Sequence, residues 1–490
     1  MDLNAQLLRS VAADPARTAI VDGKVTLTYG ELAALSAAAG RLIDGLTQRT
    51  NVGIALPPSV SFAIAYFGVL AARRVAVPIN FLISGDERDH ILRDADVDTI
   101  ITTARLAEAL RDDGRRLVLI EDEIKALREA AAAIDPAEAA AEPVDDNAPA
   151  TILYTSGTSA RAKGVVLSHR NLVSNCRAST EMLRLEPSDV LLAMLPFFHS
   201  FGLMTGLLLP LAFGGKTVML AKFDVTAMLR LVETHRVTII LTIPSVWNAM
   251  LRTDVSQRAD LSSLRVCVSG GEPLPTQTYD RFLERMGFPL SEGYGLTETS
   301  PVVSFVPMGD GRRGTVGKPL PGVRVKVIDD AGDALAPGVE GEVCVSGPNV
   351  MLGYHNLPDE TAATMTDDGW FRTGDLGRVD SEGFLAISGR KKDLIISAGE
   401  NISPREVEET ILLHPDVAEV AVVGRPDRMR GEVVSAFVVT RPGPDALTAE
   451  ALRDFCTARL AAFKVPREIA FIDELPKGYT GKVLKRKLVM

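Results

Sequence analysis

The chain has 490 residues, a length that predicts two or three structural units instead of one simple core. Hydrophobic residues make up 46% and charged residues 24%, as in ordinary globular proteins, and the formal net charge of −10 argues against a general nucleic-acid binder. Four cysteines lie far apart with no CxxC pair, which predicts reduced, mostly buried thiols and a cytoplasmic protein. The segment Met1–Arg17 lacks the pattern of a secretory signal.

The first 120 residues alternate helical and strand-like patterns. Helices are predicted at 28–39 and 60–72, and short apolar runs predict strands at 52–56, 75–79, 99–102 and 117–120. This alternation favours a layered α/β domain with parallel strand pairing. Residues 124–150, rich in Ala, Glu, Asp and Pro, predict a surface helix and a linker.

Residues 190–215 carry no charged side chain and are long enough to span a membrane. Pro and Gly interrupt the stretch at Pro196, Gly202, Gly206 and Pro210. We therefore expect a buried strand, turn and helix here, and no transmembrane segment.

The pattern changes near residue 322. Alternating runs at 323–328 and 341–346, separated by Gly and Pro, predict a small β subdomain over 322–389. Further on, Ser403–Glu406 has the pattern of a capping box with Pro404 at the first helical position.

Runs at 417–423 and 433–440 predict strands beside a second helical face around Leu452. The expected fold is a large multi-layer α/β domain at 1–390, with packed helices and the β subdomain, and a small mobile α+β domain at 391–490.

The segment Tyr154–Val165 joins two strand-like runs and has the chemistry of a polyphosphate-binding loop. Lys163 supplies a positive charge, and Gly157 and Gly164 permit close backbone approach. Four hydroxyl side chains flank Gly157, namely Thr155, Ser156, Thr158 and Ser159. Backbone N–H groups, hydroxyls and a lysine suit a triphosphate, although a plain polar hairpin is the alternative for this loop by itself.

Two other nucleotide motifs are excluded. A Walker loop needs Gly-Lys-Ser/Thr, whereas Ala162 precedes Lys163 and Gly164 follows it. The segment Gly293–Glu298 lacks the third glycine of the dinucleotide fingerprint.

Five separated motifs occur in a fixed order along the chain: Tyr154–Val165, Gly293–Glu298, Trp370–Asp375, Gly389–Asp393 and Pro476–Lys482. With them the chain resembles the adenylate-forming superfamily of acyl-CoA synthetases, luciferases and adenylation domains, from about Leu27 to Leu488. The resemblance is closest to medium- and long-chain fatty acid–CoA ligases. It implies that a carboxylic acid and ATP form an acyl-AMP, and that the acyl group then passes to a thiol.

The resemblance also implies roles for single residues. Lys482 would stabilise the charge that develops during adenylation, Glu298 would hold Mg²⁺ and Thr297 would bind the α-phosphate. Tyr294 and Gly295 would face adenine, and the ribose hydroxyls would bind Asp375 and Arg390. A further loop would line the nucleotide with Gly271, Glu272 and Pro273.

Three more positions follow from the same resemblance. Lys392 would be the hinge between the domains, Gly399 would lie on the thiol-acceptor side, and His199 would lie near the substrate carboxylate. The chain departs from the family pattern at Ala160 and Ala162, where relatives have Gly and Pro. This difference would change loop mobility more than triphosphate binding.

The substrate is predicted from the segment 191–215, which has no acidic residue. Relatives that activate amino acids usually place an aspartate there for the amine, so we expect an acid without one. Gly202, Met204 and Gly206 suit an aliphatic chain, which favours a medium- or long-chain fatty acid first and an aryl or aryl-propenoic acid next.

Coenzyme A is the expected acceptor, since no insertion is visible between 304 and 317. A carrier protein's phosphopantetheine arm is the alternative. A non-catalytic nucleotide-binding protein is the alternative of another class, and the presence of Lys482, Glu298 and Asp375 argues against it.

Overall fold

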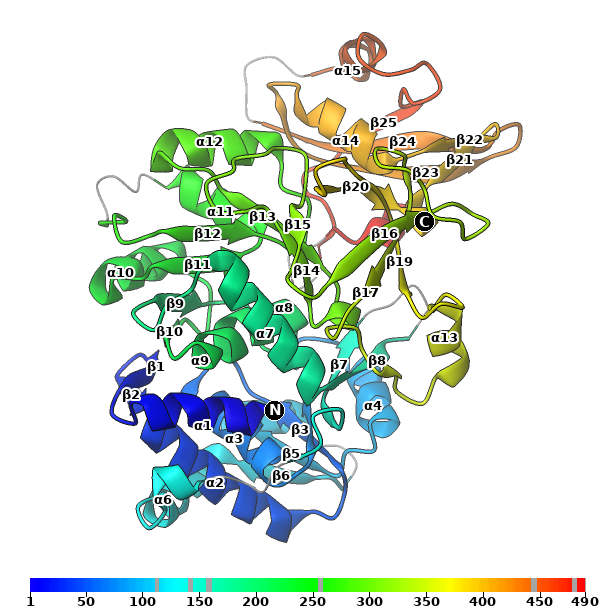
Figure 1. The fold of residues 1–490 in the computed structure, drawn as a ribbon. Helices are drawn as coiled ribbons and strands as arrows, with labels where there is room; N and C mark the ends of the chain where they lie inside the picture. The colour runs from blue at the N-terminus through cyan, green and yellow to red at the C-terminus, as the bar shows by residue number, and fades with distance from the viewer. Residues whose placement is uncertain are drawn as a thin grey trace. The chain divides into compact units, whose positions relative to one another are not determined.

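The computed structural model describes residues 1–110, 114–139, 144–155, 161–253, 259–441, 447–477 and 483–489. Contacts divide the chain into two compact units, whose helices and strands are labelled in Figure 1. Unit 1 contains Met1–Val325 and Val345–Phe371, and unit 2 contains Lys326–Cys344 and Arg372–Met490. The domain boundary predicted at residue 390 lies inside unit 2 and stays a prediction.

Unit 1 contains a nine-stranded sheet. Its strands in spatial order are β15 (Lys318–Pro319), β14 (Val302–Phe305), β13 (Ser291–Gly295), β12 (Val266–Ser269), β11 (Ile239–Thr242), β9 (Val190–Ala193), β10 (Lys216–Met219), β1 (Thr18–Asp22) and β2 (Val25–Thr28). Pairing is parallel from β13 to β1 and antiparallel at both edges. Because the inner strands are parallel, their carboxyl ends all lie on the same side of the sheet.

A second sheet of unit 1 has seven strands. In spatial order they are β18 (Gly353–Tyr354), β8 (Lys163–Ser168), β7 (Pro149–Thr155), β4 (Val75–Pro78), β3 (Asn51–Ala55), β5 (Thr99–Thr102) and β6 (Arg116–Leu119). β7 and β8 pair antiparallel on either side of the predicted phosphate loop. β18 adds to β8, with Tyr354 opposite Val165.

Helices cover both sheets of unit 1. They are α1 (Leu3–Ala13), α2 (Tyr29–Leu46), α3 (Val60–Ala71), α4 (Gly85–Asp94), α5 (Ala104–Leu110), α6 (Ile120–Ala131), α7 (His169–Leu183), α8 (Ser200–Leu203), α9 (Leu209–Ala212), α10 (Val225–His235), α11 (Pro244–Arg252), α12 (Thr276–Met286) and α13 (Pro358–Ala363). A π-helical turn spans Met204–Leu208, and 3₁₀ turns span Pro136–Glu138 and Thr297–Thr299.

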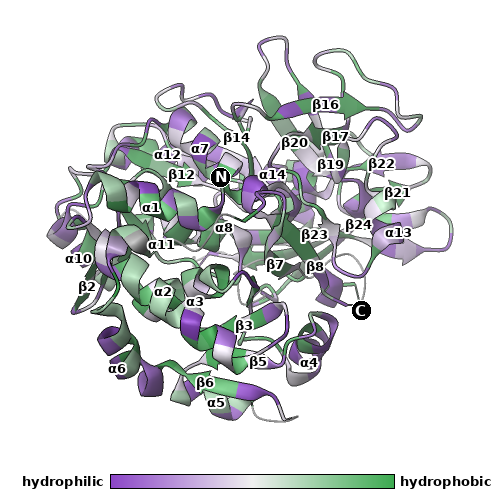
Figure 2. Cartoon of the chain, turned by 60° about the horizontal axis from the view of Figure 1, so that its bottom comes forward, coloured by the Kyte–Doolittle hydropathy of each residue, from purple (hydrophilic) through white to green (hydrophobic). Residues whose placement is uncertain are grey.

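The packing of unit 1 is layered. The largest core joins α2, α3 and α7 to apolar residues of both sheets. The opposite face of the nine-stranded sheet packs against α10, α11 and α12, and that of the seven-stranded sheet against α4 and α5. Figure 2 shows the corresponding colours, with β3 and β5 mainly hydrophobic and the surface helix α4 mainly hydrophilic. The predicted multi-layer α/β class is confirmed.

Local sequence explains where several elements begin. Thr28 and Glu31 form a capping box at α2, and Ser168 and Asn171 form one at α7. The uncharged stretch 190–215 folds as β9, α8, the π-helical turn and α9, as a buried strand, turn and helix. No helix among the described residues is long and apolar enough to cross a membrane.

Unit 2 carries two sheets. The four-stranded sheet has the order β16 (Arg324–Ile328), β17 (Gly341–Ser346), β19 (Phe371–Val379) and β20 (Leu385–Arg390). Most of its residues belong to unit 2, while Arg324, Val325, Val345, Ser346 and Phe371 belong to unit 1. The five-stranded sheet contains β22 (Glu400–Ile402), β21 (Ile395–Ser397), β24 (Gly431–Thr440) and β23 (Val417–Asp427), with β25 (Glu468–Phe471) paired to β24. The helices are α14 (Pro404–Leu412) and α15 (Ala449–Thr457), with 3₁₀ turns at Lys391–Asp393 and Lys485–Lys487.

The capping box predicted at the start of α14 is wrong in its contacts. The helix does begin at Pro404, but Ser403 makes no side-chain cap. Its hydroxyl instead donates to the Ser388 carbonyl at 2.7 Å, and the Glu406 carboxylate binds Lys464 Nζ at 2.7 Å. Tertiary partners therefore replace the local capping interaction.

All four cysteines are buried free thiols. Burial raises the pKa of Cys176 to about 12, so this side chain stays protonated at neutral pH. The expectation of buried, unpaired thiols is confirmed.

Candidate functional site

The two described ends of the predicted phosphate loop lie on paired strands. Thr155 ends β7 opposite Lys163, the first residue of β8. The loop residues Ser156, Gly157, Thr158, Ser159 and Ala160 lie outside the described residues.

The strands on either side of this loop are tightly packed. The Tyr154 hydroxyl donates to Asp94 Oδ2 at 2.5 Å, and burial together with the Asp94 carboxylate raises the pKa of Tyr154. A Cβ added at Gly164 would come within 2.9 Å of Ile152 and of the Tyr154 ring. Gly164 therefore allows tight strand packing, and the predicted close backbone approach to phosphate stays a prediction. Ala162 is buried, and its carbonyl lies 3.2 Å from His90 Nε2.

Lys163 contacts a segment that lies far along the chain. Its ammonium forms an ion pair with Glu360 of α13 and lies 5.3 Å from the centroid of the Tyr354 ring. The Tyr354 hydroxyl donates to Glu298 Oε1 at 2.9 Å. Burial, followed by the Glu298 charge, raises the pKa of Tyr354, which keeps this hydroxyl protonated. Tyr354 thus links the predicted phosphate lysine to the predicted magnesium ligand.

Sequence reasoning missed Tyr354 and Glu360. Their position depends on the antiparallel pairing of β18 with β8, which joins residues about 190 positions apart in the chain. The short strand-like run before Pro358 was the available signal, but it does not indicate a partner strand.

A second group of predicted residues surrounds the carboxyl ends of β12 and β13. Thr297 lies in the 3₁₀ turn after β13, and its hydroxyl is 3.0 Å from that of Ser200. A Cβ added at buried Gly270 would lie 3.3 Å from the Phe201 ring and 3.4 Å from the Gly293 carbonyl. The segment around α8 therefore meets both glycine-containing loops.

The loop after β12 begins with an exposed turn. Gly271 has φ +76°, a left-handed conformation that favours glycine, and its nearest neighbour is Ile243. Glu272 is half-buried and Pro273 is exposed.

Tyr294 is half-buried on β13 between two glycines. A Cβ at Gly293 would come within 2.6 Å of the Phe305 ring, and one at Gly295 within 1.9 Å of the Pro301 carbonyl oxygen. Close packing thus requires both glycines, independently of the predicted contact between Tyr294 and adenine.

His199 precedes α8 and is half-buried. Its ring meets Phe198 edge-on at 4.7 Å, and Phe198 in turn meets Phe81 edge-on at 5.4 Å. The histidine therefore lies at one end of an aromatic row. Its predicted role beside the substrate carboxylate stays a prediction.

In unit 2, Asp375 and Arg390 are Cα partners on β19 and β20. Arg390 Nε lies 2.8 Å from Asp375 Oδ1, and the Asp375 side chain is buried. The Thr373 hydroxyl accepts from the Asp375 N–H at 3.0 Å and donates to the Val343 carbonyl at 2.8 Å. These contacts fix the carboxylate that was predicted to bind the ribose.

The remaining unit 2 predictions lie in turns. Lys392 is exposed in the 3₁₀ turn after β20, and Gly399 is exposed in the β21–β22 hairpin with φ +89°. Lys482 lies outside the described residues. No group of three or more His, Cys, Asp or Glu side chains within the described ranges could hold a metal ion.

Comparison with known protein families decides what these motifs mean. A family model for AMP-binding enzymes matches residues 7–355, and one for the AMP-binding enzyme C-terminal domain matches residues 406–482. The chain belongs to the AMP-binding enzyme family.

Relatives match over almost the full chain. A long-chain-fatty-acid–CoA ligase of Bacillus subtilis is 35% identical over 99% of this chain and 94% of its own length. A sulfoacetate–CoA ligase of Cupriavidus necator is 36% identical over 96% of this chain and 93% of its own length. The crystal structure of ATP-bound MatB from Rhodopseudomonas palustris has a TM-score of 0.90 and 32% identity, covering 100% of this chain and 98% of that one.

The chain is therefore an enzyme, an AMP-forming acid–thiol ligase that uses ATP and coenzyme A to make an acyl-CoA. The named relatives act on acids as different as a fatty acid and sulfoacetate. Family membership thus identifies the reaction but not the acid.

Proposed function

We propose that this AMP-forming ligase activates a carboxylic acid with an apolar body and no amine, and transfers it to coenzyme A. Medium- or long-chain fatty acids are the first candidates, and aryl or aryl-propenoic acids are the next. Apolar side chains beside the glycine loop after β12 support this choice, since a Cβ at Gly270 would lie 3.3 Å from Phe201 and one at Gly271 would lie 3.5 Å from Ile243. The absence of an acidic residue from 191–215 supports it too, because an ammonium group in an apolar site needs a counter-charge.

The residues that support an apolar substrate differ from those that the sequence suggested. A Cβ at Gly202 would come within 2.2 Å of the Pro196 carbonyl oxygen, and one at Gly206 within 2.5 Å of the Phe197 ring. Met204 is buried in the central core. These three residues serve packing, so the proposal depends on Phe201 and Ile243 instead.

The first step forms an anhydride. A carboxylate oxygen attacks the α-phosphorus of ATP, the bond from that phosphorus to the bridging oxygen breaks, and pyrophosphate leaves. Negative charge accumulates at the α-phosphate, and Lys482 would stabilise it. Lys163 and the hydroxyls of Thr155, Ser156, Thr158 and Ser159 would hold the leaving phosphates, with the backbone at Gly157.

Mg²⁺ would bind Glu298. This ion commonly takes one or two carboxylates together with substrate phosphates, so one glutamate held by the Tyr354 hydroxyl meets its need. Tyr294 and Gly295 would lie against adenine with Gly271, Glu272 and Pro273, while Asp375 and Arg390 would bind the ribose. Thr297 would contact the α-phosphate.

The second step forms the thioester. The thiol sulfur attacks the acyl carbon, its proton goes to solvent or a nearby base, and AMP leaves with the electron pair. The loop at Gly399 would guide the thiol after rotation about Lys392, and His199 would lie beside the acyl carbon.

The test is a pyrophosphate-release screen over fatty acids of graded length, aryl acids, sulfoacetate and α-amino acids. Coenzyme A and an acyl carrier protein are supplied in separate reactions. We expect the highest kcat/KM with a fatty or aryl acid and thioester formation only with coenzyme A.

The Phe201→Ala variant should shift the preference toward bulkier acids by at least about tenfold, since each methylene accommodated is worth about 1–3 kcal/mol. Phe223→Ala, at an exposed site, is the control. A maximum for an amino acid or for sulfoacetate would contradict the proposed acid. A thioester on the carrier protein alone would contradict the proposed acceptor.

A further inference from the structure

A pocket lies at the amino ends of the strands of the nine-stranded sheet. Arg17, Pro187 and Gly214 line it, and each precedes one of the adjacent parallel strands β1, β9 and β10. The candidate active-site loops follow the carboxyl ends of strands in the same sheet. The pocket is therefore at the opposite edge from the predicted acyl and nucleotide residues.

The pocket has a volume of about 260 Å³, close to the lower end of small-molecule sites at about 300 Å³. Helix α1 contributes one face, with Gln6, Arg9, Ser10 and Ala13 at helical spacing. Arg177 reaches it from α7. This volume fits a small organic ligand.

The charge of the pocket lining is opposite in sign to the net charge of the whole chain. Three arginines line the pocket, and none of the eleven described lining residues is acidic, although the formal net charge is −10. Arg17 is held by the Gly214 carbonyl at 3.2 Å, with Asp14 at 3.7 Å beside it, and Arg9 contacts the Met1 sulfur at 3.8 Å. Asp14 partly neutralises Arg17, so Arg9, whose described contact is the weakly accepting Met1 sulfur, and Arg177 supply most of the positive charge for an anion such as phosphate.

A buried acceptor also lines the pocket. Gln6 is 6% exposed, and its Oε1 atom has no hydrogen-bond partner among the described residues. An unpaired buried carbonyl is unfavourable, and a ligand hydroxyl or amino group that reaches it on binding would relieve this cost. Phe213, Ala212 and Pro187 supply an apolar wall beside these polar groups.

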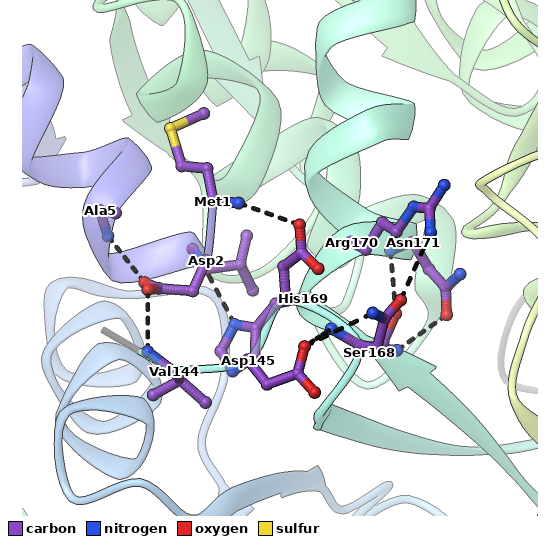
Figure 3. A network of polar contacts seen from close by, with 12 residues as sticks. Met1, Asp2, Ala5, Val144, Asp145, Ser168, His169, Arg170 and Asn171 are labelled. Atoms are coloured by element: carbon purple, nitrogen blue, oxygen red, sulfur yellow. Dashed lines mark hydrogen bonds and ion pairs between the residues drawn. The ribbon is translucent and has the colours of Figure 1, made fainter. Parts of the chain in front are cut away.

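The walls are held in place before any ligand binds. Figure 3 shows the start of α1 attached to the start of α7 and to the segment before it. The Met1 amine lies 3.1 Å from Asp146 Oδ2, and the Leu3 N–H donates to His169 Nδ1 at 3.3 Å. Further along α1, the Ser10 hydroxyl donates to the Leu211 carbonyl at 3.0 Å. Such preorganisation lowers the cost of binding.

We propose that this pocket binds a small organic phosphate, in which a phosphate monoester is joined to a flat body with hydroxyl or amino donors. Nucleoside monophosphates belong to this class. The arginines bind the phosphate, Phe213 packs against the flat body, and Gln6 accepts from a donor on the ligand.

The test measures binding of cytidine monophosphate to the full chain by calorimetry. The Arg9→Ala/Arg177→Ala variant removes two exposed cations and should weaken binding at least tenfold. Arg41→Ala/Arg230→Ala, which removes two exposed cations from α2 and α10, is matched in charge and should bind like the original chain. Equal affinity in the Arg9/Arg177 variant would overturn the proposal.

Two further measurements distinguish binding in this pocket from binding at the nucleotide site or at a plain anion site. Gln6→Met keeps the side-chain volume and should weaken cytidine monophosphate binding several-fold while inorganic phosphate binding stays the same. Saturating ATP should leave cytidine monophosphate binding unchanged. Loss of binding under ATP would place the ligand at the nucleotide site, and equally tight inorganic phosphate would indicate a plain anion site, so either result overturns the proposal.

Discussion

The contact between Lys163 and Glu360 leads to a prediction about ATP affinity. The lysine side chain is 18% exposed and the glutamate 42%, so ATP phosphates must compete with a partly screened ion pair. Such pairs are worth up to about 1 kcal/mol. Glu360→Gln should therefore lower the Kd for ATP by about two- to fivefold, as measured by calorimetry without acid.

The neighbouring Asp359→Asn variant is the control. Asp359 is exposed, and its replacement removes the same charge from the same helix turn. If both variants change the Kd equally, general charge explains the effect, and the specific competition at Lys163 is wrong.

At this scale the sequence predicted side-chain chemistry better than geometry. The ligand-binding roles of Lys163, Glu298, Asp375 and Arg390 come from their motifs and stay predictions, and the structure places the last two residues in direct contact. Tyr354 was missed because nothing local identifies a partner of Glu298. Gly164 also has a packing role that its motif did not indicate, because a Cβ there would lie 2.9 Å from the Tyr154 ring.

The β21–β22 hairpin carries strain at one residue. Ser397 pairs with Glu400 across a two-residue turn in which Ala398 has φ +53° and Gly399 φ +89°, the pattern of a type I′ turn. Asn tolerates this left-handed conformation better than Ala does. Ala398→Asn should raise the free energy of unfolding by up to about 1 kcal/mol, and Ala398→Val should lower it. Thermal unfolding of both variants checks this, and an unchanged Tm in both would contradict it.

The attachment of α1 should depend on pH. Burial lowers the pKa of His169 from 6.5, against smaller opposing contributions from Asp2 and Asp146, and the N-terminal amine lowers it further. His169 Nδ1 must be neutral to accept from Leu3 (Figure 3). Because the unfolded side chain binds a proton first, this stabilisation is present above about pH 6.5 and is lost as pH falls through the folded pKa.

Hydrogen exchange of the amides in Leu3–Leu7 measures this effect. After correction for intrinsic rates, protection should fall between about pH 7.5 and about pH 5.5, on either side of the ordinary histidine pKa. The His169→Asn variant keeps an acceptor oxygen that does not titrate, so its protection should change less. The same loss in this variant would show that another group causes it.

Element positions were largely predictable because they depend on short-range patterns. The runs at 52–56 and 99–102 became β3 and β5 within one residue, and Pro404 does begin α14. The predicted cap at Ser403 does not form because its hydroxyl donates to the Ser388 carbonyl, a contact that local sequence does not encode.

At the scale of the whole molecule, the order of the strands in the sheets could not be predicted from the sequence. β1 lies beside β10, nearly 200 residues away, and β18 joins β8 from a comparable distance. Periodicity identifies a strand and its buried face but not its neighbour. The family resemblance supplied the multi-layer class, whereas the pairings that position Tyr354 and Glu360 required the structure.

Removal of the Lys482 side chain should impair the first half-reaction and leave the second largely unchanged. Lys482 is predicted to act only on the charge that develops at the α-phosphate, while the predicted phosphate-loop and adenine residues lie in unit 1. Lys482→Ala should therefore reduce acid-dependent pyrophosphate release at least about 100-fold, the scale of losing one electrostatic contact in a transition state. ATP binding should change little.

The same variant, when supplied with acyl-AMP, should still form the thioester at close to the original rate. Lys477→Ala, which removes a lysine of the same segment bound to Glu419 at 2.6 Å, is the control and should keep both steps. Equal loss of both half-reactions in Lys482→Ala would contradict a role confined to adenylation. Equal loss in Lys477→Ala would instead assign the effect to the basic segment as a whole, because one shared property would then account for both variants.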